Sequence, residues 1–414
     1  MKGTESMTTT LKPGPRWRTA LVAGGVSALL MVAACGAPTA PGGGSQTPAT
    51  DVPAKPSQPV TLNILDIAGN LQLTQGMIDD FVAKNPDIVS KVTTEKATAP
   101  EMAGKIKAQQ DAGRLGIDMV LTGTDGLSAG IEQGLFTPLL PQFAARLDGM
   151  KNYLQPAAAM QELASNQGVV VTYYPSGPLI EYAPDRVPDP PSTPAELLAY
   201  AQAHPGKVGY ARPANSGPGR TFLMGLPYIL KDSNPKDPVN GWEKTWKFLA
   251  DLDKTITSYP SGTTDTMKNL ANGTYDIILS TTGWDINGRA IGTVPPNYKV
   301  NAFEGFTWVT DAHYAVIPKG ASADKQAAVL ALIAYMLTPD QQAKAYDKGY
   351  FYPGPAIKDV TLQMAPPESQ QVIAQYGRPE YDALIANNPT TTPLATKDIV
   401  AAFDRWDREI GATG

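Results

Sequence analysis

Residues 60–67 read VTLNILDI, and their alternating apolar side chains predict a β-strand. Residues 70–84 place their apolar side chains on one helical face, and residues 100–113 predict a second helix. Residues 117–121, IDMVL, form a short apolar run typical of a buried strand. Strands that alternate with helices in this way predict a parallel sheet and an α/β fold.

The same alternation continues along the rest of the chain. Apolar runs at 168–174, 179–183 and 276–280 predict further buried strands. Thr193, followed by Pro194 and by Glu196, is a capping-box start for a helix. The body that follows residue 59 is too long for a single hydrophobic core, so we expect two lobes.

The composition excludes several classes of protein. Hydrophobic residues make up 42% and charged residues 18%, and the formal net charge is −5, which gives no support to nucleic-acid binding. Cys35 is the single cysteine, and His204 and His313 are the only histidines. A disulfide framework, a Cys- or His-rich metal site and a cysteine nucleophile in the folded body are therefore not expected. We expect no metal and no cofactor.

The first 35 residues have the features of a lipoprotein signal peptide. Arg16 and Arg18 precede an uncharged apolar run at 19–34, which is short for a bilayer span. The run ends in VAAC at 32–35, which resembles a lipobox with Cys35 as the lipidated residue. A plain signal peptide or an N-terminal anchor is the alternative. Lipidation would hold the protein on the extracytoplasmic face of the cell membrane.

Residues 36–59 are rich in Pro, Gly, Ser and Thr and have no periodic apolar pattern. This composition predicts a disordered tether. A signal peptide, a tether and a globular body in this order predict a domain held just outside a membrane.

Three stretches of the body resemble the type II extracellular solute-binding proteins of bacterial ABC importers. The first is GIDMVL at 116–121 with GLFTPL at 134–139. The second is PLIEYAPD at 178–185 followed by PSTPAEL at 191–197. The third comprises residues 312–318 and 327–343. Their order along the chain matches that of the family.

The resemblance implies an α/β, two-lobe periplasmic-binding-protein-like fold (type II), in which each lobe is a mixed sheet flanked by helices. Residues 60–173 and 312–353 would form lobe 1, and residues 174–311 and 354–414 would form lobe 2. Hinge crossings would lie at 172–176, 309–313 and 350–354. A small solute would bind between the lobes and be delivered to an ABC transporter permease by a monomeric binding protein.

In the first lobe, polar residues follow the predicted strands. Gly69 would let a ligand approach the backbone, and Asn70 offers an amide, although Asn70 is also a good helix cap. Thr122, Thr124 and Asp125 follow the 117–121 strand, where hydroxyl and N–H groups would face the ligand. A simple turn is the alternative for this second group.

In the second lobe, residues 215–220 read NSGPGR and precede a helix expected from Thr221. Ser216 and the two glycines resemble an anion cradle, and Arg220 could pair with a carboxylate or phosphate. A solvent-facing loop is the alternative.

Aromatic and acidic residues gather near the predicted crossings. Aromatic rings flanked by carboxylates suit an amine. The candidates are Tyr173, Tyr174, Trp284, Asp285, Trp308 and Asp311. The order FTWVTD at 306–311 is similar to a passage of the polyamine-binding members, but this chain has no acid in 215–220. We expect a cationic or zwitterionic amine such as a polyamine; a small anion or a sugar is the alternative.

No catalytic motif is visible, so we expect a binding protein and no enzyme. Neither GxSxG nor HExxH occurs. The motif SADK at 322–325 resembles an acylation motif but is better explained as a helix cap before the apolar helix 327–337. An extracellular sensor or hydrolase on the same fold remains the alternative of another class.

Overall fold

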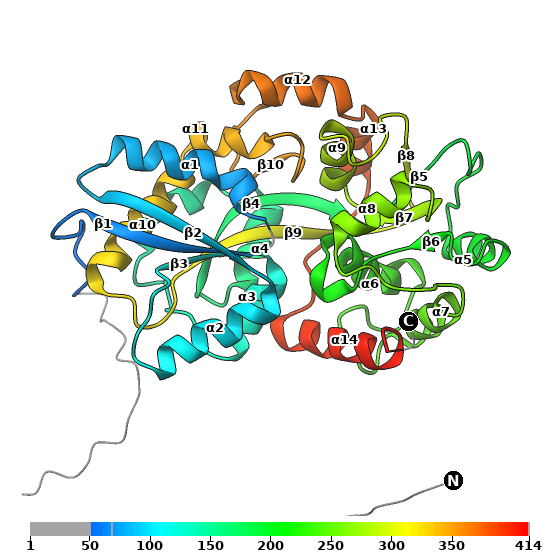
Figure 1. The fold of residues 1–414 in the computed structure, drawn as a ribbon, viewed down its shortest axis with the longest axis horizontal. Helices are drawn as coiled ribbons and strands as arrows, with labels where there is room; N and C mark the ends of the chain where they lie inside the picture. The colour runs from blue at the N-terminus through cyan, green and yellow to red at the C-terminus, as the bar shows by residue number, and fades with distance from the viewer. Residues whose placement is uncertain (1–50, 68, 413–414) are drawn as a thin grey trace, which may run out of the picture. The chain divides into compact units, whose positions relative to one another are not determined.

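The computed structural model describes residues 51–67 and 69–412. The predicted signal peptide, Cys35 and residues 36–50 of the predicted tether lie outside the described residues. Within the described part, helices and strands alternate and build two separate sheets, so the predicted α/β class is confirmed (Figure 1).

The first sheet has the order β10-β4-β9-β3-β1-β2, and β11 pairs with β9 beyond this path. The strands β1, β2 and β3 are parallel, whereas β9 is antiparallel to both β3 and β4. The sheet is therefore mixed, as expected. Its strands are β1 (Val60–Ile67), β2 (Val89–Ala97), β3 (Met119–Thr122), β4 (Gly168–Gly177), β9 (Trp308–Val316), β10 (Gly354–Pro355) and β11 (Thr390–Thr391).

Helices cover both faces of this sheet, and β1 shows why. Leu62 and Ile64 pack in one apolar cluster with α1 and α10, whereas Leu65 and Ile67 pack in another with α2, α3 and α4. Burial on both faces explains the near-continuous apolar run at the end of β1. The helices of this lobe are α1 (Leu71–Lys84), α2 (Ala99–Asp111), α3 (Thr124–Glu132), α4 (Gln155–Leu163), α10 (Ala323–Met336) and α11 (Pro339–Gln342).

The second sheet has the order β6-β7-β5-β8 and is also mixed. Ile277 and Leu279 of β7 face α6 and α7, whereas Ile278 between them packs with α8. The strands are β5 (Leu179–Tyr182), β6 (Val208–Gly209), β7 (Ile277–Ser280) and β8 (Lys299–Asn301). The helices are α5 (Pro194–Ala203), α6 (Gly217–Ile229), α7 (Glu243–Asp253), α8 (Thr263–Ala271), α9 (Thr282–Ala290), α12 (Pro367–Tyr376), α13 (Glu380–Asn387) and α14 (Thr396–Glu409).

The long strands β4 and β9 cross between the two lobes (Figure 1). Along β9, Trp308 and Val309 belong to the core of the second lobe, whereas Ala312 and Tyr314 belong to the first. Asp311 lies where the strand passes from one core to the other. The predicted hinge segments 172–176 and 309–313 fall on these strands.

The third passage lies later in the chain than the predicted boundary at residue 353. Ala356 packs in the core of the first lobe, and Ile357 makes a bridge with Tyr153. The N–H of Lys358 donates to the carbonyl of Asn152 at 2.8 Å. The chain therefore joins the second lobe only after Lys358.

Two predicted helix starts are confirmed by their hydrogen bonds. The hydroxyl of Thr193 accepts from the N–H of Glu196, whose side chain completes a capping box. Ser322 caps α10 by accepting from the N–H of Lys325, so the SADK motif forms a helix cap.

The prediction of a disordered tether over 36–59 is wrong for its last residues. Val52 is buried in the core of the first lobe, and the guanidinium of Arg146 donates to the carbonyls of Pro53 and Ala54 at 3.0 and 3.1 Å. The hydroxyl of Ser57 donates to Asp324 at 2.5 Å. We call residues 52–57 the strap. The prolines of this segment predicted disorder, and the tertiary contacts that hold the segment in place cannot be read from the sequence.

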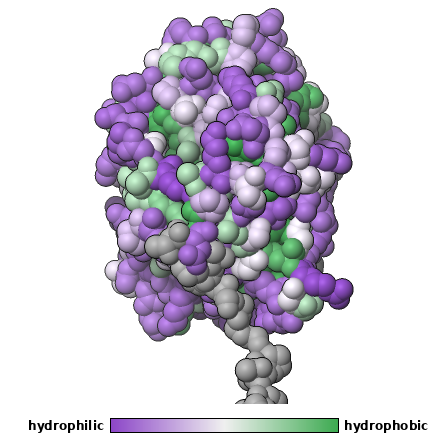
Figure 2. Space-filling view, turned by 90° about the vertical axis from the view of Figure 1, so that its left-hand side faces the viewer, coloured by the Kyte–Doolittle hydropathy of each residue, from purple (hydrophilic) through white to green (hydrophobic). Residues whose placement is uncertain are grey.

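The surface of the first lobe is mostly hydrophilic on the face drawn in Figure 2, with apolar residues scattered in small groups. None of the helices in the described part of the chain combines the length and the hydropathy of a bilayer span.

Candidate functional site

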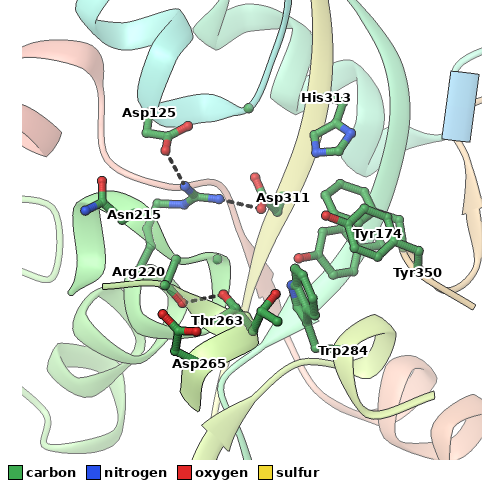
Figure 3. A pocket seen from close by; sticks show the side chains of 16 residues that line it. Asp125, Tyr174, Asn215, Arg220, Thr263, Asp265, Trp284, Asp311, His313 and Tyr350 are labelled. Atoms are coloured by element: carbon green, nitrogen blue, oxygen red, sulfur yellow. Dashed lines mark hydrogen bonds and ion pairs between the residues drawn. The ribbon is translucent and has the colours of Figure 1, made fainter. Parts of the chain in front are cut away.

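A cavity of about 290 Å³ lies where the two lobes meet, beside the crossing strands (Figure 3). Both lobes and the 350–351 segment contribute to its walls. The lining residues are Gly123, Asp125, Tyr174, Asn215, Ser216, Gly217, Arg220, Gly262, Thr263, Thr264, Asp265, Trp284, Asp311, His313, Tyr350 and Phe351.

Four helices begin at this cavity, since α3, α6, α8 and α9 each place a residue of their first turn in its wall. The N-terminus of a helix carries partial positive charge and N–H groups without helical partners. The cavity is therefore surrounded by donors from both lobes.

The helix α6 starts earlier than predicted, at Gly217 and not at Thr221. Ser216 caps it by accepting from the N–H of Gly219 at 3.2 Å, and Pro218 lies in the first turn, which favours this start. Ser216 also shares a hydrogen bond of 2.8 Å with the hydroxyl of Thr263. Arg220 consequently lies on a helix and not in a loop.

Arg220 connects the two lobes inside the cavity wall. Its guanidinium donates to Asp311 at 2.5 Å and lies 3.7 Å from Asp125 of the first lobe. All three side chains are nearly buried, with exposed fractions of 5%, 3% and 11%. The other oxygen of Asp311 accepts from the hydroxyl of Thr124 at 3.0 Å.

Burial governs the protonation of this group. Burial raises the pKa of Asp311 above its usual value, and the positive charge of Arg220 opposes that rise. Burial alone would lower the pKa of Arg220, but the carboxylates of Asp311 and Asp125 raise it above its ordinary value. Arg220 is therefore charged at every physiological pH.

The remaining titratable side chains leave the lining with more negative than positive charge. Burial lowers the pKa of His313 well below its ordinary value, so its ring is neutral at pH 7. Asp265, at the start of α8, is a third carboxylate, and it accepts from the hydroxyl of Ser261 at 2.9 Å. The lining thus contains three carboxylates and one guanidinium.

Aromatic rings form the wall on the other side of the cavity (Figure 3). Tyr174 stacks on Phe351 with ring centroids 3.8 Å apart, and His313 lies 4.0 Å from Phe351. Trp284 meets Tyr350 edge to face at 5.0 Å. We call Tyr174, Trp284, Tyr350 and Phe351 the aromatic wall. Electron-rich ring faces of this kind attract cations.

Three buried polar atoms of lining residues have no hydrogen-bond partner in the described part of the chain. They are the hydroxyl oxygen of Tyr174, Nε of Arg220 and Nδ1 of His313. Buried polar groups are nearly always hydrogen-bonded, and the exceptions concentrate at functional sites. This unmet capacity is consistent with a binding site for a polar solute.

Seven of the predicted site residues do not reach the cavity. Five of them are absent from the lining: Gly69 is half-buried, and Asn70, Thr122, Thr124 and Tyr173 are buried. Asn70 donates to the carbonyl of Ile67 at 2.7 Å and does not cap α1 with its side chain. Thr124 supports Asp311, as described above.

Asp285 points away from the cavity into the second lobe. It accepts hydrogen bonds from Arg289, Arg378 and Tyr381 and is fully buried. Trp308 is also fully buried, and its indole N–H donates to the carbonyl of Leu384 at 3.1 Å. Both side chains therefore build the core of the second lobe, and the expected ligand contact is not supported for either.

Several lining residues were not among the predicted ones. Thr263, Thr264 and Asp265 belong to the start of α8, and the GTTD motif at 262–265 is a helix-start signal that marks this edge of the sheet. His313 was visible as a lone histidine on a crossing strand. Tyr350 and Phe351 were predicted only as part of a hinge.

Comparison with known proteins places this arrangement in a family. The family described as bacterial extracellular solute-binding protein matches residues 76–375. The chain belongs to this family. This assignment agrees with the resemblance seen in the sequence. In the described residues of this solute-binding protein, no three or more His, Cys, Asp or Glu side chains are grouped so that they could hold a metal ion.

One curated relative is protein YnjB of Escherichia coli (strain K12). It is 29% identical over 178 residues, which are 39% of this chain and 44% of YnjB. The match thus spans less than half of that relative.

Solved structures share the fold of this solute-binding protein. The spermidine/putrescine ABC transporter substrate-binding protein PotD from Streptococcus pneumoniae is 14% identical, with a TM-score of 0.55 over 84% of this chain and 99% of PotD. The periplasmic binding protein AfuA from Actinobacillus pleuropneumoniae, with fructose-6-phosphate bound, is 14% identical, with a TM-score of 0.58 over 84% of this chain and 98% of AfuA. The two-lobe type II fold is confirmed, and at this identity the similarity concerns the fold alone.

Proposed function

We propose that this protein captures a small solute bearing an amine, either cationic or zwitterionic, and delivers it to the permease of an ABC importer. The observation that carries the proposal is the charge of the cavity. The lining contains three carboxylates, those of Asp125, Asp265 and Asp311, and one guanidinium, together with the aromatic wall. Carboxylates and ring faces together attract ammonium groups.

The surrounding helix N-termini favour a zwitterion over a simple cation. First-turn residues of α3, α6, α8 and α9 line the cavity. Their N–H groups would donate hydrogen bonds to the anionic end of a solute while the carboxylates bind its amine. A small anion or a sugar phosphate is the second candidate, since AfuA shares the fold with fructose-6-phosphate bound.

The proposal extends to the cellular setting. Lipidation at Cys35 would anchor the protein on the extracytoplasmic face of the cell membrane, where a binding protein meets its permease. Metabolic labelling with an alkyne fatty acid, compared between the full chain and Cys35→Ala, tests this part. Absence of label on both chains would contradict it.

A thermal-shift screen of residues 51–414 tests the ligand class. A ligand that binds only the folded state stabilises it, by about 2.7 kcal/mol at a concentration of 100 Kd. We expect amines and amino-acid-like zwitterions to raise Tm, and Asp265→Asn and Trp284→Ala to weaken the effect. Stabilisation by oxyanions or neutral sugars alone would contradict the proposal.

A further inference from the structure

We infer that Arg220 is a specificity-determining residue that limits the cavity to solutes with a single ammonium group and thereby excludes diamines and polyamines. The inference rests on the proposed function, because it concerns which amines the same cavity accepts. It follows from the hydrogen bonds that already occupy each carboxylate of the cavity.

The carboxylate of Asp311 is fully engaged by groups of the protein itself. One oxygen accepts from Arg220 at 2.5 Å, and the other accepts from the hydroxyl of Thr124 at 3.0 Å and from the N–H of Ala312 at 2.9 Å. The side chain is 3% exposed. A solute ammonium would have to displace a buried guanidinium to reach it.

Asp125 is engaged in a similar way. One of its oxygens accepts from the N–H of Gly126 at 2.9 Å, and the other lies 3.7 Å from the guanidinium of Arg220. Arg220 therefore neutralises the two carboxylates from one position between them (Figure 3). The resident guanidinium takes the place that a second ammonium of a diamine would need.

Asp265 differs from both. Its one hydrogen-bond donor in the described part of the chain is the hydroxyl of Ser261, and its side chain is exposed. Figure 3 places it on the side of the cavity opposite Asp125, along the same wall as Thr263 and Trp284. One open carboxylate in a cavity that also exposes an indole ring suits one ammonium.

A double substitution can test this inference without changing the net charge of the cavity lining. The wild-type lining carries three carboxylates and one guanidinium, a net charge of −2. In the double variant Arg220→Met/Asp311→Asn, Asp125 and Asp265 remain, and the net charge is again −2. The double variant therefore keeps the net charge of the wild type but has two carboxylates without a guanidinium partner, Asp125 and Asp265.

Three probes of equal carbon number separate the alternatives by isothermal titration calorimetry. They are putrescine with two ammonium groups, butylamine with one, and 4-aminobutanoate with one ammonium and one carboxylate. We expect the wild type to bind one of the two monoamines at least about tenfold more tightly than putrescine. We expect the double variant to reverse this order. The single variant Arg220→Met, if it folds, should also gain affinity for putrescine.

The outcomes distinguish this inference from the proposed function. Tighter binding of putrescine than of both monoamines by the wild type would overturn the inference and leave amine binding intact. An unchanged order in a double variant with wild-type circular dichroism would also overturn it. If none of the three amines bound either protein, both the inference and the proposed amine specificity would fall.

Discussion

Arg220 of the second lobe and Asp311 of a crossing strand form a buried ion pair of 2.5 Å in the wall of the cavity. A charge buried with its partner is costly to leave alone, and removal of one partner typically costs about 3–5 kcal/mol. Arg220→Met should therefore lower the free energy of unfolding by about that amount. Chemical denaturation measures it. Arg220→Met/Asp311→Asn is the control, because it should recover much of the loss; equal losses in both variants would contradict a buried pair.

Trp284 and Trp308 should separate binding from stability. Trp284 lies partly exposed in the cavity wall, so Trp284→Ala should weaken amine binding by about tenfold or more through loss of a cation–π contact. Trp308 is fully buried in the core, so Trp308→Ala should cost about 3–5 kcal/mol of stability. Calorimetric titration and denaturation of both variants check the pair. A loss of affinity confined to Trp308→Ala would show that the cavity is not the binding site.

A methyl group at position 217 should occupy the part of the cavity beside Tyr174 with little effect on folding. A Cβ there would lie 3.4 Å from the hydroxyl of Tyr174 and 3.6 Å from Asp311, which is ordinary contact. Gly217→Ala should thus retain wild-type stability, because Ala is also the better helix former, and should lose solute affinity. Gly104→Ala, which meets nothing within 4 Å, is the matched control on an exposed helix. Equal affinity in both variants would argue against solute binding beside Tyr174.

The buried carboxyl of Glu181 should make stability depend on pH. Burial raises its pKa from 4.5 to about 8, and the nearby charge of Asp285 adds to the rise. The folded protein thus keeps this proton between pH 4.5 and 8, where the unfolded chain has released it. Its contribution to stability is complete below pH 4.5 and is lost as the pH rises through 8.

Glu181→Gln tests that dependence, since its amide stays neutral. The stability of the wild type relative to this variant should fall between pH 5 and pH 8 in denaturant titrations. A constant difference across this range would mean that Glu181 does not hold its proton. Asp285, Arg289 and Arg378 remain in place in both proteins, so the two chains differ in this cluster only at residue 181.

The strap should contribute measurably to the first lobe. A chain that begins at residue 58 loses the buried Val52 and the hydrogen bonds from Arg146 and Ser57, and we expect it to be about 1–3 kcal/mol less stable than one that begins at residue 51. Ser57→Ala in the longer chain should reproduce only a small part of the loss. Identical denaturation curves for the two chains would show that the strap contacts add nothing.

The sequence predicted the scaffold better than the site. The alternating run of β1 and the caps at Thr193 and Ser322 depend on local patterns, and the structure contains them where they were expected. The order of the three family-like stretches predicted the fold correctly, because the order of segments can be read directly from the sequence.

The direction in which a side chain points was the part that the sequence could not supply. Trp284 and Asp285 are neighbours, yet one lies in the cavity wall and the other in a buried cluster with Arg378, about ninety residues further along the chain. Asp265 and Phe351 reach the cavity through tertiary packing, which no local pattern reports. Trp308, like Trp284, was predicted from the sequence as an aromatic residue near a crossing, but its side chain faces the core.

One close approach in the fold bears on how the site would respond to a solute. A Cβ on Gly283 would lie 1.9 Å from the carbonyl oxygen of Tyr350, so the start of α9 is seated directly on the segment that carries Tyr350 and Phe351. Trp284 follows Gly283 and contacts Tyr350 from there. The rings of Trp284 and Tyr350 are thus held together by the backbone contact between their two segments, and the entropy of ordering them is lost during folding and not at the moment of capture.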